Sequence, residues 1–570
     1  MEHEWMQGTK ENQVVEQHPN PQIQRLAVLS AYSISVNNAK LFIQKMDKCG
    51  FPKERLLTPL ENTVSPVPGL NQYQVESLIF NTRYQHQPFV IVMCESTQEV
   101  QQAYLTATQF NLPIRVRSGG HDHAGECSGD NVILIDVSRI KTFQLCDNIA
   151  TIGAGYRFYQ LTPKLAEHDR MIAHGTCATV GLTGYIQGGG WGPWTRKYGM
   201  CCEHLVSATV VLGDGTITEV SAESNPHLFW ALRGGGGMSY GIVTELRVKT
   251  FPLPKEIHRF ELQWNLYPKI NGMLQPIPTH PTIDVLKNWE QAIKSLDTPK
   301  LLGTNLQIDA LPESSNHCDI ETISHHCTMY GYWEGTEQDL HQFIAVQFGA
   351  CFPDLVQVYE AHGTDFDGKK YDHSLMSTWG RDSLCQNGSP FPPDYDAPAP
   401  HKITSRLVSE RGLKPEGYTA LLQSLTALLQ SLTSPLIKPE NRDQGLFSYV
   451  TLGAITGGFY HHSDDLEDIS FPYRQCQYTV QYQTWWNEEI KQKLELQNNP
   501  VLVDVNRAMD WIDKAREADI PGTYGAFISF KDPAIPTSVY FDRSYRDLIG
   551  IKEKYAKDKF NHLRTNKTII

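Results

Sequence analysis

Short apolar runs alternate with amphipathic segments over the first half of the chain, a pattern typical of mixed helix and sheet. Residues 89–93 are continuously apolar, which predicts a buried strand. Ser96 follows, with Glu99 three residues later, and this spacing predicts the start of a helix that runs to about residue 111. Similar apolar runs predict further strands at 113–117, 132–135 and 150–153.

Turn residues locate the remaining elements up to residue 254. Asp214-Gly215 separates two alternating segments, 208–212 and 216–220, and predicts a hairpin. Pro at the first position and Gly at the stop predict a helix over 225–234. The remaining predictions are a helix at 162–168, capped by Thr162 and with Pro163 at its first position, and a strand at 242–248.

From about residue 255 the segments are longer, with more Trp, Tyr and His and fewer glycine clusters. The near repeat of 421–427 at 428–434 is too short for a coiled coil and predicts an amphipathic helix that packs on a sheet. Residues 478–486 are aromatic and amide-rich and predict a strand. The tail from 522 predicts a strand and then a helix over 542–555, and the polar lead-in of about 65 residues contains one candidate helix, 39–47.

Composition and charge exclude several classes of protein. The chain has 570 residues, which is enough for two or more cores, and a net charge of −13. An acidic chain repels phosphate backbones, so we expect no nucleic acid partner. No apolar run reaches about 18 residues, so we expect no membrane span. The N-terminus lacks a basic region followed by an apolar core, which favours a cytoplasmic location.

Cofactor and metal motifs of several common kinds are absent from the sequence. The 12 Cys residues form no CxxC pairs, which argues against a zinc ribbon or a small disulfide scaffold. No GxGxxG follows a predicted strand and no Walker loop is present, so a nicotinamide-binding Rossmann domain and a nucleotide triphosphatase are not supported. His121 and His123 have the spacing of metal ligands, but only Asp122 and Glu126 lie near them, which is a weak metal pattern.

Two glycine-punctuated loops each contain one reactive side chain. The first, residues 117–121, reads Arg-Ser-Gly-Gly-His, and the second, residues 175–181, reads Gly-Thr-Cys-Ala-Thr-Val-Gly. Consecutive glycines let backbone N–H groups converge on an anion such as a pyrophosphate. Taken alone, the first loop is more typical of a plain turn with an incidental His, and the Cys of the second is more often structural than reactive. Together with the glycine clusters at 188–192 and 234–237, they form a specific pattern.

Because of this pattern, residues 88–254 closely resemble the flavin domain of the vanillyl-alcohol-oxidase superfamily. Within that superfamily they are most similar to the flavin domain of the berberine-bridge-enzyme-like oxidases. The resemblance is nearest to the hexose and oligosaccharide oxidases in the strand that contains Gln481-Tyr482-Gln483-Thr484-Trp485-Trp486. The matching segments are 117–121, 175–181, 188–192, 196–199, 214–215, 228–234, 241–245 and the closing stretch 540–569.

The resemblance implies an α+β fold with a two-part FAD-binding domain of the PCMH type. The second domain is expected to hold an antiparallel sheet covered by helices. The implied boundaries are an N-terminal extension (1–65), the first part of the FAD domain (66–255), the substrate domain (256–500) and a C-terminal segment that returns to the FAD domain (501–570).

The resemblance also implies a bicovalent FAD. His121 matches the residue bonded to the 8α-methyl group of the flavin, and Cys177 matches the residue bonded to C6. The other residues expected to bind the cofactor are Arg117, Ser118, Gly119, Gly120, Asp122, Gly125, Gly175, Thr176, Thr179, Val180, Gly181, Gly184, Gly188, Gly241, Ile242, Val243, Tyr540 and Asn566.

Residues for the substrate are expected around 471–486. On a strand Thr479, Gln481 and Gln483 share one face, and their amides suit sugar hydroxyls, although a plain polar sheet surface is an alternative. Many relatives place a tyrosine base in the segment that aligns with 527–532, but Phe530 stands there. The expected bases are therefore Tyr482 first, then Tyr473, Tyr524, His461 or His462, with Gln481 and Gln483 beside them.

The activity implied by the resemblance is oxidation of an alcohol carbon, at C1 of an aldose or oligosaccharide, with O2 reduced to H2O2. Val180, three residues after the flavin Cys, has the small size common in oxidases of this family, whereas a bulkier residue favours a dehydrogenase. The alternatives are an oxidase that tailors a secondary metabolite and a flavoprotein without turnover. The expected partners are a small-molecule substrate and O2, with the chain a monomer or homodimer.

Overall fold

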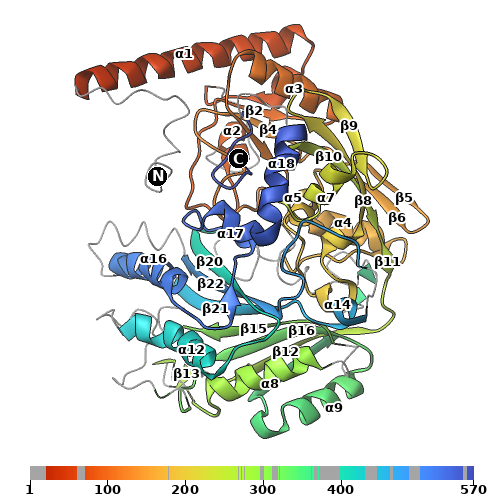
Figure 1. The fold of residues 1–570 in the computed structure, drawn as a ribbon, viewed down its shortest axis with the longest axis vertical. Helices are drawn as coiled ribbons and strands as arrows, with labels where there is room; N and C mark the ends of the chain where they lie inside the picture. Colours follow the sequence, from red (N-terminus) through yellow and green to blue (C-terminus); the bar gives the residue numbers. More distant parts are fainter. Residues whose placement is uncertain are drawn as a thin grey trace.

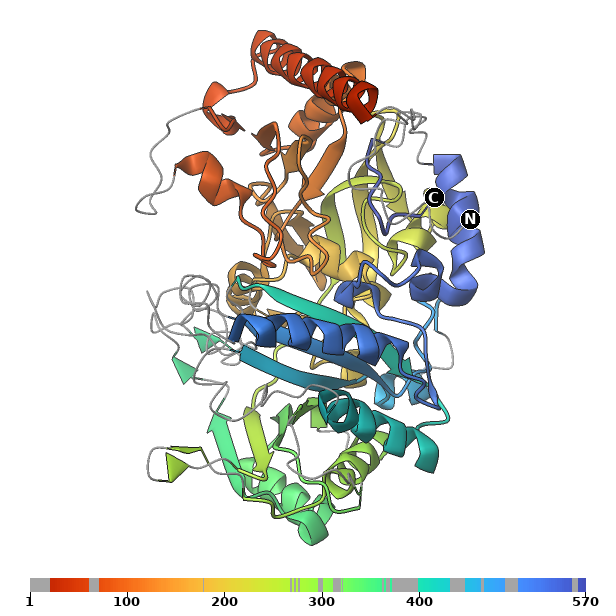
Figure 2. The same cartoon turned by 90° about the vertical axis from the view of Figure 1, so that its left-hand side faces the viewer.

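The chain folds into an upper region, formed mainly by its first 250 residues, and a lower region built around one large sheet, as the computed structural model in Figures 1 and 2 shows. The structure describes residues 21–60, 71–177, 179–266, 269–270, 273–274, 277–295, 301–310, 319, 321–360, 363–364, 370–371, 398–430, 446–462, 466–486, 501–555 and 562–569.

The first sheet contains the apolar strands predicted near the start of the chain. Its order is β1-β2-β4-β3, with β2, β4 and β3 parallel and β1 antiparallel. Helices α1 (Pro21–Lys48) and α3 (Thr97–Gln109) bury one face, and α2 (Gln72–Ser77) lies on the other. The strands are β1 (Leu56–Leu57), β2 (Val90–Met93), β3 (Ile114–Arg117) and β4 (Ile133–Asp136).

The second sheet is antiparallel, in the order β5-β6-β10-β8-β9. Its predicted hairpin is present, since Gly215 at the turn has φ +81° and the Asp214 side chain accepts a hydrogen bond from Thr216 N–H. Its strands are β5 (Phe143–Cys146), β6 (Ile149–Gly153), β8 (Leu205–Leu212), β9 (Ile217–Ser221) and β10 (Gly241–Lys249). The helices of this region are α4 (Phe158–Ala166), α5 (Leu182–Gln187), α6 (Thr195–Tyr198) and α7 (Pro226–Leu232).

The third sheet has eight antiparallel strands in the order β17-β12-β16-β15-β21-β22-β20-β23. The strands are β12 (Ile257–Trp264), β15 (Leu301–Asp309), β16 (Cys327–Glu334), β17 (Leu355–Glu360), β20 (His401–Val408), β21 (Leu446–Ala454), β22 (Tyr478–Trp486) and β23 (Thr523–Tyr524). One face is covered by α8 (Thr282–Lys294), α9 (Glu337–Gln347), α12 (Pro415–Gln430) and α16 (Val501–Glu517) (Figure 1). The predicted α+β class, with an antiparallel sheet covered by helices, is confirmed.

Several smaller elements lie outside the three sheets. They are the two-stranded ribbons β7 (Arg170–Met171) with β11 (Phe251–Pro252), β13 (Lys269–Ile270) with β14 (Met273–Leu274) and β18 (Gly363–Thr364) with β19 (Lys370–Tyr371), and the short helix α14 (Gly458–His462). Within the described residues no helix combines the length and apolar character that a membrane span needs.

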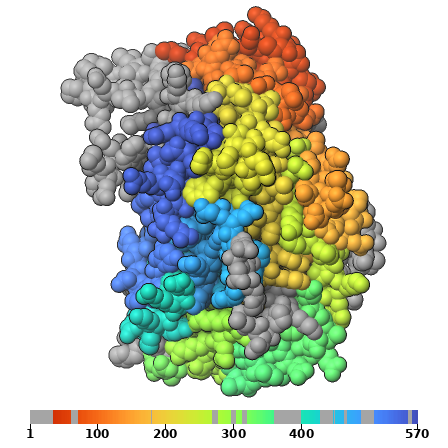
Figure 3. All heavy atoms as spheres, turned by 45° about the vertical axis from the view of Figure 1, so that its right-hand side comes forward, coloured from red at the N-terminus to blue at the C-terminus, as the bar shows by residue number. Residues whose placement is uncertain are grey.

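The C-terminal segment returns to the upper region. Helices α17 (Thr537–Phe541) and α18 (Tyr545–Tyr555) lead back to it, and α18 contacts α7, where Figure 3 shows the blue end of the chain against the yellow residues. Ile114 N–H, at the start of β3, donates to His562 O at 2.9 Å. By contrast α16 and β23 still belong to the layer of the large sheet, so the return begins after Tyr524 rather than at the expected residue 501.

Two predictions near the N-terminal side need correction. Residues 21–60, the described part of the predicted extension, are not separate from the first sheet, because Phe42 of α1 is fully buried in the core on that sheet and Arg55 forms two hydrogen bonds with Glu99. Helix α4 begins at Phe158, so Thr162 lies inside it and donates to Phe158 O at 2.8 Å instead of capping it. The residue before α4 is an arginine, which is not a preferred cap, and the sequence therefore gave little signal for its start.

Candidate active site

A cavity of about 290 Å³ lies where the glycine-rich loops of the upper region meet the large sheet. Loop 118–123, segment 175–188, segment 236–243 and the turn 527–531 form its walls on one side. The opposite wall comes from strands β15, β16, β21 and β22. The predicted cofactor segments and the predicted substrate strand therefore line one space.

The two loops that contain His121 and Cys177 touch through their glycines. A Cβ on Gly119 would lie only 2.5 Å from Gly181 N, so a side chain at this position would force the loops apart. Real Cβ contacts are essentially never that short, and the close approach accounts for glycine at both positions.

The His121 and Cys177 side chains both reach the cavity. The His121 ring stacks on Phe80, with ring centroids 3.5 Å apart and planes 19° apart, which fixes the imidazole orientation. The Cys177 thiol is half-buried, with Thr176 Oγ1 3.8 Å from its sulfur. One ligand in this space can reach both side chains.

The walls of the cavity also suit a flat cofactor, because parts of them are main chain without side chains. A Cβ on Gly184 would meet no atom within 4 Å, and one on Gly237 would meet only Gln187 Oε1, at 3.9 Å. These glycines expose bare backbone to the cavity, so an aromatic ring system can lie directly against it. The residues present are thus compatible with FAD.

Most of the predicted cofactor residues line the cavity, and a few support it from behind. Those that line it are His121, Cys177, Ser118, Gly119, Gly120, Asp122, Gly175, Thr176, Val180, Gly181, Gly184, Gly188, Gly241, Ile242 and Val243. Those outside the lining are Arg117, Gly125, Thr179, Tyr540 and Asn566.

The outlying residues have structural contacts of their own. Arg117 is buried and donates through Nε to Asp136 Oδ2 at 2.5 Å, which joins the ends of β3 and β4. The Tyr540 hydroxyl accepts a hydrogen bond from Asp532 N–H at 2.8 Å, and Asn566 donates to Pro533 O at 3.3 Å. The structure thus gives these residues contacts that hold the walls in place.

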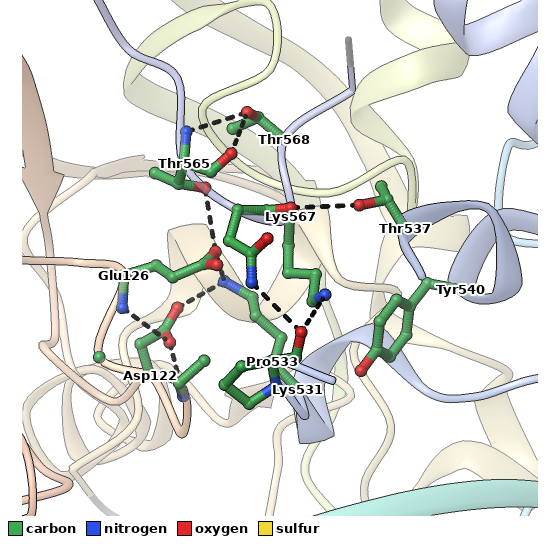
Figure 4. A network of polar contacts seen from close by, with 12 residues as sticks. Asp122, Glu126, Lys531, Pro533, Thr537, Tyr540, Thr565, Lys567 and Thr568 are labelled. Carbon is green, nitrogen blue, oxygen red and sulfur yellow. Dashed lines mark hydrogen bonds and ion pairs between the residues drawn. The ribbon is translucent and has the colours of Figure 1, made fainter. Parts of the chain in front are cut away.

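A buried ion cluster ties the His121 loop to the C-terminal segment (Figure 4). Lys531 Nζ lies 2.5 Å from Asp122 Oδ2 and 3.4 Å from Glu126 Oε2, and Thr565 Oγ1 donates to Glu126 at 3.0 Å. Burial alone would raise the pKa of Asp122, but the Lys531 ammonium outweighs it and holds that pKa below its usual value. Sequence reasoning missed Lys531, because nothing local in the sequence links it to Asp122.

Strand β22 presents its amides to the cavity, as predicted. Gln481 and Gln483 both line it. Gln483 donates to Thr451 Oγ1 at 2.9 Å and accepts from Trp485 Nε1 at 2.9 Å, so its orientation is fixed. Asn305 of β15 and Tyr330 of β16, which the sequence did not single out, add polar groups to the same wall.

The structure contradicts Tyr482 as the base. Side chains alternate across a strand, so Tyr482 points away from the face of Gln481 and Gln483. Its hydroxyl lies 2.7 Å from Ser424 Oγ of α12 and its ring packs on Trp511 of α16. It is part of the core beneath the helices and does not reach the cavity.

Tyr473, Tyr524 and His461 also lie outside the cavity lining. The Tyr473 hydroxyl donates to Val539 O. Tyr524 is 42% exposed and contacts Cys476, and His461 is exposed beside Thr456. The side chain of His462 falls outside the described residues. Among the described residues no group of three or more His, Cys, Asp or Glu is arranged to hold a metal.

Comparison with known proteins agrees with this geometry. Residues 88–221 match the model of an FAD binding domain. The chain is 32% identical over 244 residues to a glucooligosaccharide oxidase from Sarocladium strictum, a match that covers 42% of this chain and 46% of that protein. The chain therefore spans less than half the length of this curated relative.

Solved structures share the fold over most of the chain. BBE-like 1 from Physcomitrella patens superposes with a TM-score of 0.67 at 20% identity, covering 88% of this chain and 96% of that one. A glucooligosaccharide oxidase from Acremonium strictum, described as having a 6-S-cysteinyl, 8α-N1-histidyl FAD, superposes with a TM-score of 0.65 at 19% identity, covering 87% and 94%. The predicted resemblance, the fold class and the FAD-binding character of the first domain are confirmed.

Proposed function

We propose that this protein is an FAD-dependent oxidase that oxidises an alcohol carbon, with C1 of an aldose or oligosaccharide as its substrate position. One observation carries the proposal: His121 and Cys177, on two loops in backbone contact, line the same cavity as Gln481 and Gln483. A cofactor site and a polar substrate wall thus face each other across one space.

His121 would hold the cofactor at the 8α-methyl group and Cys177 at C6. FAD bound there would supply the two-electron oxidation of the substrate carbon, with O2 as the final electron acceptor and H2O2 as the product. The glucooligosaccharide oxidase of known structure, with its two-point FAD attachment, supports this assignment.

The sheet wall supports a sugar substrate. Gln481 and Gln483 offer amide donors and acceptors, which match the paired donors and acceptors of neighbouring hydroxyls. Trp485 and Tyr330 add aromatic surface to the same cavity, which suits the apolar faces of a pyranose ring. This combination favours a polyhydroxylated substrate over a purely apolar one.

Anaerobic mixing tests the function. Purified protein is mixed with a panel of mono- and oligosaccharides while the flavin absorbance is recorded, and air is then admitted. We expect bleaching by an aldose and recovery in air with one H2O2 per turnover. If no sugar bleaches a flavin that dithionite still reduces, the sugar oxidase proposal is wrong, and secondary-metabolite alcohols are the next panel. A flavin that no alcohol reduces would instead indicate a flavoprotein without turnover.

A further inference from the structure

Two histidines from distant parts of the chain form a hydrogen-bonded pair at the wall of the cavity. His123 Nδ1 lies 2.8 Å from His401 Nε2, and His401 Nδ1 lies 2.8 Å from Ala399 O. Asn81 holds both backbones: its amide donates to His123 O at 2.7 Å and to His401 O at 3.1 Å. The pair is thus positioned by a third group.

The direction of these hydrogen bonds fixes the proton positions. A carbonyl oxygen only accepts, so His401 Nδ1 must carry the proton that it donates to Ala399 O. A neutral His401 then has a lone pair on Nε2, and His123 must donate to it from Nδ1. In a neutral His123 the remaining nitrogen, Nε2, therefore carries a lone pair.

The surroundings keep both rings neutral. The pKa of His401 lies well below its usual value. Burial is the largest cause, and the neighbouring His123 is the second. Burial and then His121 lower the pKa of His123 to about 3, against the opposing effect of the Asp122 carboxylate. Lys531 and, near His401, Arg83 are the other charges that act on the pair, and both disfavour the imidazolium form.

His123 is placed where a base is missing. Its side chain lines the cavity, with its ring centroid 5.6 Å from that of His121 and 6.2 Å from that of Phe530. Phe530 lines the same cavity and has no ionisable group. We propose that Nε2 of His123 is the general base that accepts the proton of the substrate hydroxyl, an assignment that rests on the proposed function.

The step balances in atoms and electrons. The substrate O–H bond breaks and its proton forms an N–H bond at His123 Nε2, while the O–H electron pair becomes the second bond of the new carbonyl. The C–H electron pair would leave with its hydrogen to the two-electron oxidant that a bound FAD would supply, and O2 would be the final acceptor of two electrons and two protons, giving H2O2. His123 keeps its Nδ1–H bond to His401 throughout, so His401 is a positioning residue.

The test compares His123→Asn with the wild type in anaerobic flavin reduction by the best alcohol of the panel. An asparagine amide can replace Nδ1 as donor to His401 but offers no base, so we expect the reduction rate to fall by about 10²–10⁴-fold. Flavin retained after acid precipitation and the spectral change on binding a sugar lactam should stay as in the wild type, which shows an intact site. An unchanged rate would overturn the proposal, whereas a wild type that no alcohol reduces would overturn the proposed function.

Variants of His401 and a spectroscopic readout separate positioning from folding. His401→Gln places an amide oxygen at the level of Nε2 and should preserve most of the rate, while His401→Leu lets His123 change tautomer and should slow reduction. Nitrogen-15 NMR of histidine-labelled protein should show His123 Nε2 unprotonated in the wild type and in His401→Gln, and partly protonated in His401→Leu. A wild-type His123 with its proton on Nε2 would overturn the assignment, whatever the activity.

Discussion

Lys531 illustrates how one residue can determine the stability of a site. Its ammonium is buried between Asp122 and Glu126, and this contact fixes the loop next to His121. Burial alone would lower the pKa of Lys531, but the two carboxylates outweigh it and raise that pKa above its usual value. A buried charge pair is costly to break from one side, because the other charge stays buried without compensation.

Lys531→Met should therefore destabilise the protein by about 3–5 kcal/mol, measured by urea denaturation at pH 7. The matched control is Lys53→Met, which removes a pair with Asp47 whose lysine side chain is 75% exposed, and should cost about 1 kcal/mol or less. Equal effects of the two substitutions would show that the Lys531 cluster contributes no more than a surface pair.

The same cluster predicts a pH dependence. Because the pKa of Asp122 is lower in the folded than in the unfolded chain, its contribution is complete above the unfolded value of about 4 and is lost as pH falls through the folded value. Wild-type stability should fall over this acid range more steeply than that of Lys531→Met, in denaturation curves between pH 6 and 3. Parallel curves would contradict the assignment of this titration to Asp122.

The proposed covalent attachment of the cofactor also depends on single residues. Cys177→Ala should leave FAD bonded through His121 alone, which changes the flavin spectrum of the denatured protein. The double variant with His121→Ala should release all flavin into the supernatant after acid precipitation. A denatured Cys177→Ala protein with the wild-type spectrum would exclude the bond to C6.

At the level of elements, the contact between Gly119 and Gly181 sets the spacing of the two attachment loops. A methyl group on Gly119 would meet Gly181 backbone at 2.5 Å, so Gly119→Ala must separate the loops. We expect the fraction of covalently bound flavin to fall strongly, as measured by fluorescence in denaturing gels. The control is Gly550→Ala in α18, where a Cβ meets nothing within 4 Å and helix propensity should rise by up to about 1 kcal/mol.

The local pattern of apolar, polar and turn residues predicted many helices and strands, but it did not predict which face of a strand meets the cavity. The strands β2, β10 and β22 and the hairpin β8–β9 lie where alternation and turn residues placed them. Period-2 alternation also grouped Gln481 with Gln483, but it could not decide which face of β22 meets the cavity, and Tyr482 was chosen from the wrong one.

The parts of the site that sequence reasoning missed depend on contacts between distant residues. His123 and His401 are 278 residues apart, and Asp122 and Lys531 are 409 apart. Neither pair has a local signature, because hydrogen-bond partners are chosen by the packing of the two regions and not by spacing along the chain. The resemblance predicted that no tyrosine base stands at Phe530, but only the structure places His123 beside Phe530.

At the scale of the whole molecule, buried polar contacts join the upper region to the large sheet. Arg196 of α6 is buried and donates to Thr456 O and to Ile293 O, each at 2.9 Å. Gly303 of β15 lies so close to Pro193 that a Cβ would approach the Pro193 carbonyl oxygen to 1.7 Å. The cavity thus depends on a closely packed interface that can accommodate few substitutions.

Arg196→Met should weaken this interface, because two carbonyls lose a charged donor and each such hydrogen bond contributes about 1.5–3 kcal/mol. We expect a lower midpoint in thermal unfolding and faster cleavage by protease between the two regions. Arg139→Met, which removes a 40% exposed side chain paired with Glu95, is the control and should leave both measurements nearly unchanged. Equal behaviour of the two variants would show that Arg196 does not hold the regions together.

The return of the chain to its first domain has a consequence for biosynthesis. Glu126 accepts a hydrogen bond from Thr565, which the ribosome adds 439 residues later. At a translation rate of about 5–20 residues per second, this interval is on the order of 20–90 s. For most of this time the nascent His121 loop lacks Lys531, which follows Glu126 by 405 residues, and for all of it the loop lacks Thr565. The walls of the cavity are therefore completed only after residue 565 has been added, and we expect the proposed flavin attachment to follow that point.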